Sequence, residues 1–229
     1  MIGDKIVMND KKYLYCYKMT DDTGFAPNPY HGFLTLATCK PTIRRCAKKD
    51  YWISGWTAVS VEGKNGKRMV FRDKQKLIYL AKVSEVLLIE DYWRKYPQKR
   101  PNEICNGVPI NRKQCGKNGK VERSTVYNDC GDNIYEPSSK SPLGFIQHEN
   151  SGEHGDAEKE HDLSGKNVLV CKEFYYFGIE NAIEIEVNDG FYVPRCKKLE
   201  LESKNAQNII NKVKEIFNKR SGIYENYIK

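Results

Sequence analysis

The chain has 229 residues, of which 39% are hydrophobic, 30% are charged and 11% are aromatic, and its formal net charge is +8. The length allows a substantial core, and the aromatic content excludes a disordered chain, because Tyr, Phe and Trp bury large areas. The first twenty residues lack a signal-peptide stretch, and no run approaches the ~18 apolar residues of a membrane span. We therefore expect a cytoplasmic protein that folds as one domain over residues 1–229, without membrane association.

The cysteine content does not predict a disulfide framework. Such frameworks are typical of small secreted domains, and this chain is neither small nor visibly secreted. We expect free thiols, several of them in the core, at Cys16, Cys39, Cys46, Cys105, Cys115, Cys130, Cys171 and Cys196.

Charge is unevenly distributed along the chain. Residues 40–49 contain five basic residues and no acid, and residues 94–123 contain nine basic residues against two acids. Residues 147–162 are predominantly acidic. A basic face attracts phosphate through Coulomb forces and counterion release, although a solvated lysine-rich surface has the same composition.

The N-terminal part predicts two strands followed by a helix. Residues 12–19 alternate β-favouring and polar residues, residues 20–32 form a turn-rich loop, and residues 33–38 form a short buried strand. Pro41 suits the first position of a helix that directs its apolar side inward and its basic residues outward. The inward residues are Ile43, Cys46 and Ala47.

The central part predicts an accumulating antiparallel sheet. Residues 51–71 form two β-rich runs around Asn65-Gly66, a dipeptide that favours tight hairpins. Residues 77–88 predict one long apolar strand, and a short helix begins at Glu90, whose acid suits the positive end of the helix dipole.

An irregular insertion is expected over residues 97–165. Residues 97–142 are rich in Asn, Gly, Lys and Pro, and residues 147–164 are polar enough to be mobile. Order returns with a strand at 167–177, another run at 183–187 and an amphipathic C-terminal helix at about 204–220. The predicted fold is α+β, with a mixed, mainly antiparallel curved sheet or barrel and a few packed helices.

Metal and cofactor motifs are missing from the sequence. No CxxC pair occurs, and there is no phosphate loop, GxGxxG, deaminase motif or GxSxG elbow. His148, His154 and His161 lie among carboxylates and could gather a metal, but a solvated loop is the favoured explanation. We expect no cofactor and no metal, and a cysteine nucleophile paired with His31 or His148 stays open.

Aromatic and polar residues suggest a pocket for an unstacked base. Aromatic rings stack on bases, and polar groups read the base edge. The stacking candidates are Trp52, Trp56 and Trp93, the phosphate-binding candidates are Lys40, Arg44 and Arg45, and the edge-reading candidates are Asn28 and Asn150. The competing interpretation places the aromatic residues in the core and the arginines on an ordinary surface.

Five segments, in order along residues 24–178, resemble a known family. They are GFAPNPYHGFLTLATCKPTIRRCAKKDYWISG at 24–55, LIYLAKVSEVLLIEDYW at 77–93, GDNIYEP at 131–137, QHENSGEH at 147–154 and VLVCKEFYYFG at 168–178. Together they resemble the nucleotide-modification-associated domain family, second type; Lys49 stands where that family has Gly. The arrangement is also remotely similar to the modified-base-reading β-barrels of the pseudouridine-synthase-associated superfamily, which includes EVE and ASCH-like domains.

These resemblances imply a connection with nucleotides, without an established mechanism. The first hypothesis is a protein that recognises a modified base in a basic, aromatic-lined cleft, linked to DNA modification or anti-phage defence. The second is an enzyme that modifies or removes a base or nucleotide, with Asp132, His148 or His154 as general acid or base. The expected partner is a nucleotide or nucleic acid, with DNA favoured over RNA; a role in binding a partner protein is the third alternative.

Overall fold

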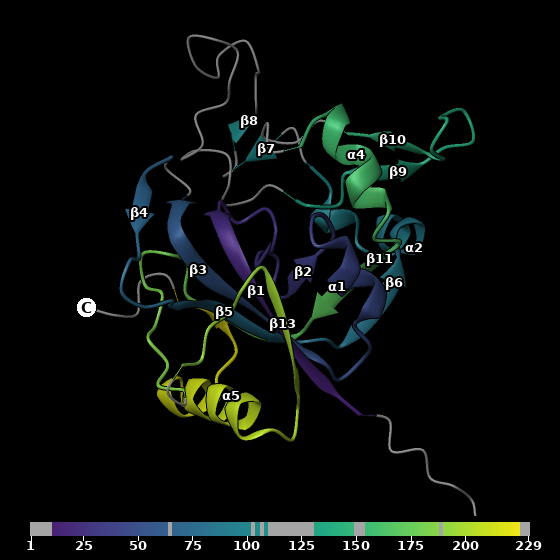
Figure 1. The fold of residues 1–229 in the computed structure, drawn as a ribbon. Helices are drawn as coiled ribbons and strands as arrows, with labels where there is room; N and C mark the ends of the chain where they lie inside the picture. The colour runs from purple at the N-terminus through teal and green to yellow at the C-terminus, as the bar shows by residue number, and fades with distance from the viewer. Residues whose placement is uncertain are drawn as a thin grey trace, which may run out of the picture.

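The structure is a computed structural model, and it is α+β, as predicted (Figure 1). It describes residues 11–63, 66–101, 104–105, 108–109, 131–148, 154–187 and 190–224. Asn150 and the cysteines at 115 and 130 lie outside these residues.

A seven-stranded mixed sheet forms the centre of the molecule, with the order β13-β1-β3-β5-β12-β14 and β4 paired to β3. The pairs β1–β3 and β12–β14 are parallel, and the other pairs are antiparallel. The strands are β1 (Tyr13–Asp22), β3 (Trp52–Gly63), β4 (Arg68–Val70), β5 (Leu77–Lys82), β12 (Glu173–Tyr176), β13 (Cys196–Glu200) and β14 (Gly222–Ile223).

Smaller sheets and helices surround this sheet. A three-stranded antiparallel sheet contains β2 (Leu34–Leu36), β11 (Asn167–Cys171) and β6 (Glu85–Leu88), and two hairpins pair β7 (Ile104–Cys105) with β8 (Val108–Pro109) and β9 (Tyr135–Pro137) with β10 (Phe145–Gln147). The described helices are α1 (Pro41–Cys46), α2 (Ile89–Lys95), the 3-10 helix η1 (Pro97–Lys99), α4 (Asp156–Leu163) and α5 (Lys204–Ile216). None of the described sheets closes into a barrel.

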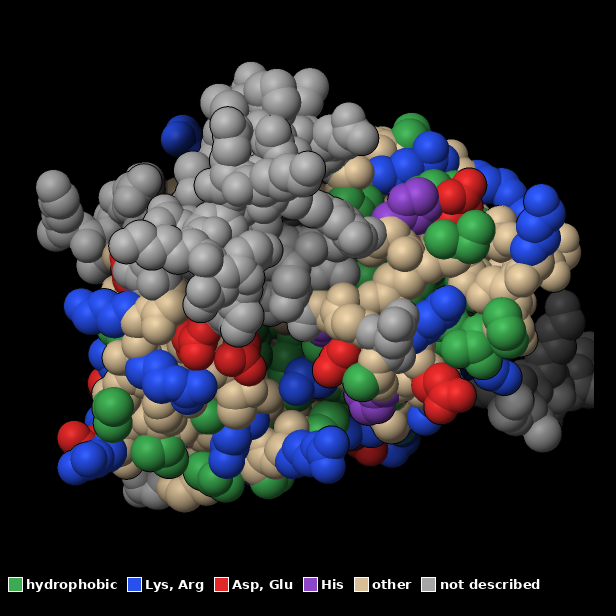
Figure 2. All heavy atoms as spheres, turned by 90° about the horizontal axis from the view of Figure 1, so that it is seen from above, with side chains coloured by type: hydrophobic (Ala, Val, Ile, Leu, Met, Phe, Trp, Pro, Cys, Tyr) green, Lys and Arg blue, Asp and Glu red, His purple; other side chains and the backbone are tan. Residues whose placement is uncertain are grey.

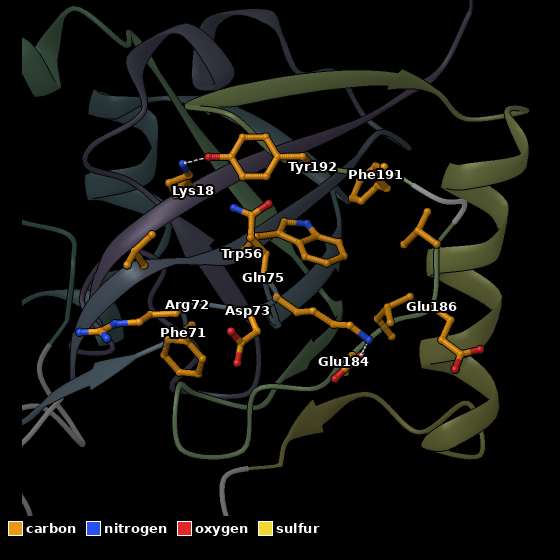
Figure 3. A pocket seen from close by; sticks show the side chains of 15 residues that line it. Lys18, Trp56, Phe71, Arg72, Asp73, Gln75, Glu184, Glu186, Phe191 and Tyr192 are labelled. Atoms are coloured by element: carbon orange, nitrogen blue, oxygen red, sulfur yellow. Dashed lines mark hydrogen bonds and ion pairs between the residues drawn. The ribbon is translucent and has the colours of Figure 1, made fainter.

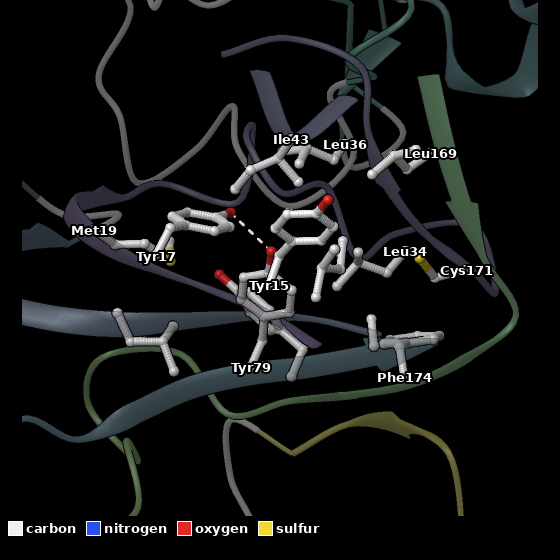
Figure 4. Packing of buried hydrophobic residues seen from close by; sticks show 14 of the residues in the cluster. Tyr15, Tyr17, Met19, Leu34, Leu36, Ile43, Tyr79, Leu169, Cys171 and Phe174 are labelled. Carbon is white, nitrogen blue, oxygen red and sulfur yellow. Dashed lines mark hydrogen bonds between the residues drawn. The ribbon is translucent and has the colours of Figure 1, made fainter. Parts of the chain in front are cut away.

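The central sheet is buried on both faces. Successive residues of a strand point to opposite faces, and consecutive residues of β1 are apolar or aromatic. Leu14 and Cys16 belong to the core beneath α5, whereas Tyr15 and Tyr17 face the three-stranded sheet and α1. Figure 4 shows this second core, in which the Tyr79 hydroxyl donates a 2.8 Å hydrogen bond to that of Tyr17. The molecule is therefore layered, with α5 on one face of the sheet and α1 with the smaller sheet on the other (Figure 1).

Several predicted elements are confirmed. β3 and β4 pair as the two strands of the predicted hairpin, α1 begins at Pro41, and α5 covers most of the predicted C-terminal helix. No helix in the described residues is both long and apolar enough to pass through a bilayer.

Four predictions about elements are wrong. Residues 77–88 form two strands in different sheets, because after β5 the chain crosses at Val83-Ser84, where Val83 N pairs with Tyr51 O and Ser84 N with Val170 O. Residues 167–177 divide in the same way, into β11 and β12. Residues 183–187 form only an isolated bridge at Ile183, and part of the segment expected to be mobile is the helix α4.

Candidate functional site

A cavity of about 560 Å³ lies between β3, the loop after β4 and residues 184–187 and 190–192. Figure 3 shows Tyr192, Trp56 and Phe191 along one side, with Arg72, Asp73 and Glu184 opposite. We call this cavity the aromatic pocket; its lining includes Lys18, Trp56, Arg72, Asp73, Lys74, Glu184, Glu186, Phe191 and Tyr192.

The rings of the aromatic pocket differ in accessibility. Trp56 is 2% exposed, its Nε1 donates to Ser54 Oγ at 2.9 Å, and its ring lies 5.5 Å from that of Phe191. Tyr192 is 53% exposed, and its hydroxyl accepts a 2.6 Å hydrogen bond from Lys18 Nζ. Trp56 and Phe191 therefore form a fixed apolar wall, and Tyr192 is the ring that an entering ligand can cover.

Charges of both signs surround these rings. Lys18, Arg72 and Lys74 supply the cations, and Lys74 is paired with Glu184. The acidic residues are Asp73, Glu184 and Glu186. Cations suit a phosphate, and carboxylates accept hydrogen bonds from hydroxyl or amino groups.

A second constellation joins a thiol, an imidazole and a carboxylate. Cys39 Sγ lies 3.4 Å from His154 Nε2, and His154 Nδ1 lies 2.5 Å from Asp162 Oδ2. We call these three residues the thiol cluster. It is also the group of described residues whose donor atoms are close enough to one another to hold a metal ion.

Three hydrogen bonds fix the Asp162 carboxylate. Besides His154, the backbone N–H of Cys39 donates to it at 2.6 Å and the Tyr135 hydroxyl at 2.8 Å. Burial alone would raise its pKa, but these donors, His154 first, hold the pKa of Asp162 below its usual range. Burial also opposes charging of His154, yet its bonds to Asp162 and Cys39 outweigh burial and raise the pKa of His154 to about 10.

Local backbone geometry presents the thiol. Cys39 and Lys40 have φ values of 54° and 39°, so two consecutive non-glycine residues occupy the left-handed region between β2 and α1. α4 supplies Asp162, and His154 lies just before that helix. The cluster thus joins segments more than one hundred residues apart.

Arg44 lies beside the thiol cluster but is fully buried, so the prediction that it faces outward is wrong. Its Nε donates to Cys39 O at 2.8 Å and its Nη1 to Ala37 O at 2.6 Å and Asn167 O at 2.9 Å; its Nη2 donates to Asp162 O. The guanidinium is satisfied by backbone carbonyls, which favours a structural role over phosphate binding.

The other two predicted phosphate ligands lie apart from each other. Lys40 packs over the Tyr17 ring, with Nζ 4.8 Å from its centroid, and burial lowers the pKa of Lys40. Arg45 is exposed and lines an open basic depression with Lys48, Lys49, Lys95 and Lys172. Figure 2 shows that basic side chains are spread over one described face rather than gathered in one patch.

The remaining tryptophans do not join Trp56. Trp52 belongs to the core under α5, where Lys214 Nζ lies 5.0 Å from its ring centroid. Trp93 stacks on His148 at 4.9 Å, and the guanidinium of Arg100 lies 4.2 Å from its centroid. His148 also contacts Glu136 at 2.6 Å, so His148 and His154 belong to different groups.

Asn28 and Asp132 belong to a buried polar network around Lys99. Lys99 Nζ donates to Asn28 Oδ1 at 2.7 Å, and the Asp132 carboxylate accepts from Thr35 and Tyr92, each at 2.7 Å. Burial raises the pKa of Asp132 and lowers that of Lys99 to about 7. Because both are at most 1% exposed, this network favours a structural role.

Sequence reasoning named Trp56 and His154 but missed the residues that join them in the two sites. It named Cys39 only as a thiol, and the partners expected for a cysteine nucleophile were His31 or His148, whereas Cys39 pairs with His154. Phe191 and Tyr192 went unremarked, although their adjacency after a turn is a usable aromatic signal.

Comparisons with curated proteins and with solved structures gave no significant match. The remote similarity to the modified-base-reading barrels is not confirmed, because the described sheets stay open. A family model, nucleotide modification associated domain 2, matches residues 11–226. The chain therefore belongs to the nucleotide modification associated domain 2 family.

Proposed function

We propose that the protein recognises a nucleotide by taking up its base in the aromatic pocket, as part of a nucleotide-modification system. The observation that supports this most directly is the combination of an exposed ring, Tyr192, with a fixed apolar wall and basic residues at the rim. We further propose that the ligand is a modified base, carried by DNA, and that recognition serves DNA modification or anti-phage defence.

The size and lining of the pocket suit such a ligand. Sites for small molecules usually measure about 300 to 1,000 Å³, and this cavity lies inside that range. A base that stacks on Tyr192 would gain about 1 to 3 kcal/mol. Lys18 and Arg72 can contact the phosphate, while Asp73 or Glu186 can accept hydrogen bonds from an amino or hydroxyl group.

The proposal is tested by titrating the protein with nucleoside monophosphates and with short single-stranded DNA and RNA, ordinary and modified, while following tryptophan fluorescence. Tyr192→Ala is expected to weaken binding by about 5-fold to 100-fold, the equivalent of one lost stacking contact. Arg72→Ala should also weaken binding and reduce its dependence on salt, because one phosphate contact is lost.

Arg94→Ala is the matched control, since Arg94 is also an exposed arginine but pairs with Glu90 on α2, outside the pocket. It should leave the affinity unchanged. Equal affinities for Tyr192→Ala and the unaltered protein would place the ligand elsewhere, and no binding by the unaltered protein would contradict the proposal.

A further inference from the structure

We propose that Cys39 is a catalytic nucleophile that accepts an acyl group from an ester or thioester, with His154 as its general base and Asp162 as a positioning residue. This activity is separate from base recognition in the aromatic pocket and does not depend on it. Nucleophilic catalysis by a thiol needs a base within reach and a third group that orients the base. The 3.4 Å and 2.5 Å contacts of the thiol cluster supply both relationships.

The directions of these contacts favour an acyl-transfer relay over a metal site. The thiol approaches Nε2 of His154 and the carboxylate approaches Nδ1, and these two nitrogens point away from each other on an imidazole ring. One ion cannot bind Nε2 beside the thiol and also take the carboxylate oxygen bonded to Nδ1. The other oxygen of Asp162 accepts a hydrogen bond from the Cys39 N–H, so the carboxylate holds both His154 and the backbone of Cys39 in place.

The surroundings offer hydrogen-bonding capacity for a substrate. Cys39 is half-buried, and the ring of Phe25 packs edge-on against His154 at 5.1 Å. Gln147 donates through Nε2 to His154 O at 2.9 Å, while its buried Oε1 has no hydrogen-bond partner among the described residues. The hydroxyl of Thr38, next to Cys39, is also buried without a hydrogen-bond partner among the described residues. Buried polar atoms without partners call for an explanation, and a bound ligand supplies one.

The reaction proceeds in two balanced steps. The Cys39 thiol gives its proton to His154 Nε2, and the sulfur attacks the carbonyl carbon of the substrate. The carbonyl π electrons move to oxygen, then return and expel the alcohol or thiol, which takes the proton from the imidazolium and leaves a thioester on Cys39. Water then gives a proton to His154 and attacks the thioester, which releases the carboxylic acid and restores the thiol.

Asp162 stays ionised in both steps and holds the Nδ1 proton. The raised pKa of His154, about 10, means that the ring keeps the proton that it takes from Cys39 until the leaving group accepts it.

The experiment uses p-nitrophenyl acetate with the full-length protein at neutral pH. We expect a burst of nitrophenol and one acetyl group, which peptide mass spectrometry locates on Cys39. Cys39→Ser should abolish the burst, and His154→Gln should slow it by about 100-fold, the usual contribution of a general base. Cys46→Ser is the matched control, because Cys46 is an exposed cysteine outside the cluster, and it should leave the burst unchanged.

A structural role for the cluster predicts different results. Acetylation of Cys39 no faster than that of Cys46, or a burst unchanged in a folded His154→Gln variant, would overturn the proposal. So would tightly bound zinc that protects Cys39 in the purified protein.

For Asp162→Asn, the pH profile of acetylation should move to lower pH, since His154 loses the carboxylate that favours its charged form. Tyr192→Ala should acetylate normally, which separates this proposal from the proposed nucleotide binding.

Discussion

Arg44 holds together parts of the chain that are distant in sequence, and its neighbour Arg45 provides a natural comparison. Arg44→Lys should lower the free energy of unfolding by about 2 to 4 kcal/mol, because one ammonium group cannot reach every carbonyl that the planar guanidinium satisfies, and the stranded carbonyls are buried. Arg45→Lys should change it by less than about 0.5 kcal/mol, since Arg45 is exposed. Urea unfolding of both variants measures the difference; equal stabilities would show that Arg44 does not stabilise this junction.

At the level of single residues, the sequence predicted residue types better than positions. It indicated that a tryptophan would line a pocket, and Trp56 does, but Trp52 and Trp93 are engaged elsewhere. Sequence pattern cannot distinguish these three, because each follows or begins a β-rich run. Cys39 and His154 lie on chain segments that meet only in the folded protein, so no local sequence motif predicts that they pair.

The contact between His154 and Asp162 attaches the segment before α4 to the helix itself, and its strength should depend on pH. The folded-state pKa of His154 is raised from 6.5 to about 10, so the protonated ring stabilises the folded state fully below pH 6.5, and this contribution is lost as pH rises towards 10. The stability difference between the unaltered protein and His154→Gln should therefore shrink over that interval. Urea unfolding at several pH values tests this.

Taking a difference between two proteins cancels the titration of other groups, including Lys99, whose lowered pKa of about 7 acts in the opposite direction. A stability difference that stays constant from pH 6.5 to 10 would show that the ring is neutral in the folded state.

At the level of elements, periodic patterns predicted well and continuous apolar runs did not. The stripe of α5 and the turn dipeptide before β4 each specify their element locally. Residues 77–88 and 167–177 read as unbroken strands because each run is largely apolar in sequence, with no turn signal between its two halves. Each run divides because its two halves pair with strands of different sheets, and hydrophobicity does not predict which strands will pair. At the division, Lys172 N donates a hydrogen bond to Ser84 Oγ at 3.0 Å.

At the level of the whole molecule, α5 closes one face of the central sheet, and the fold depends on that layer. Ile209 is fully buried against the sheet, whereas Ile216, on the same helix, is 40% exposed. Ile209→Ala should cost about 2 to 5 kcal/mol, because it removes buried methyl groups and leaves a cavity, while Ile216→Ala should cost less than about 1 kcal/mol. Thermal unfolding with calorimetry would compare them. Trp56 lines the aromatic pocket and also belongs to the core beneath α5, together with Ile209. Ile209→Ala should therefore weaken nucleotide binding as well, whereas Ile216→Ala should not. Equal effects of the two substitutions on stability would mean that α5 is not packed on the sheet in solution.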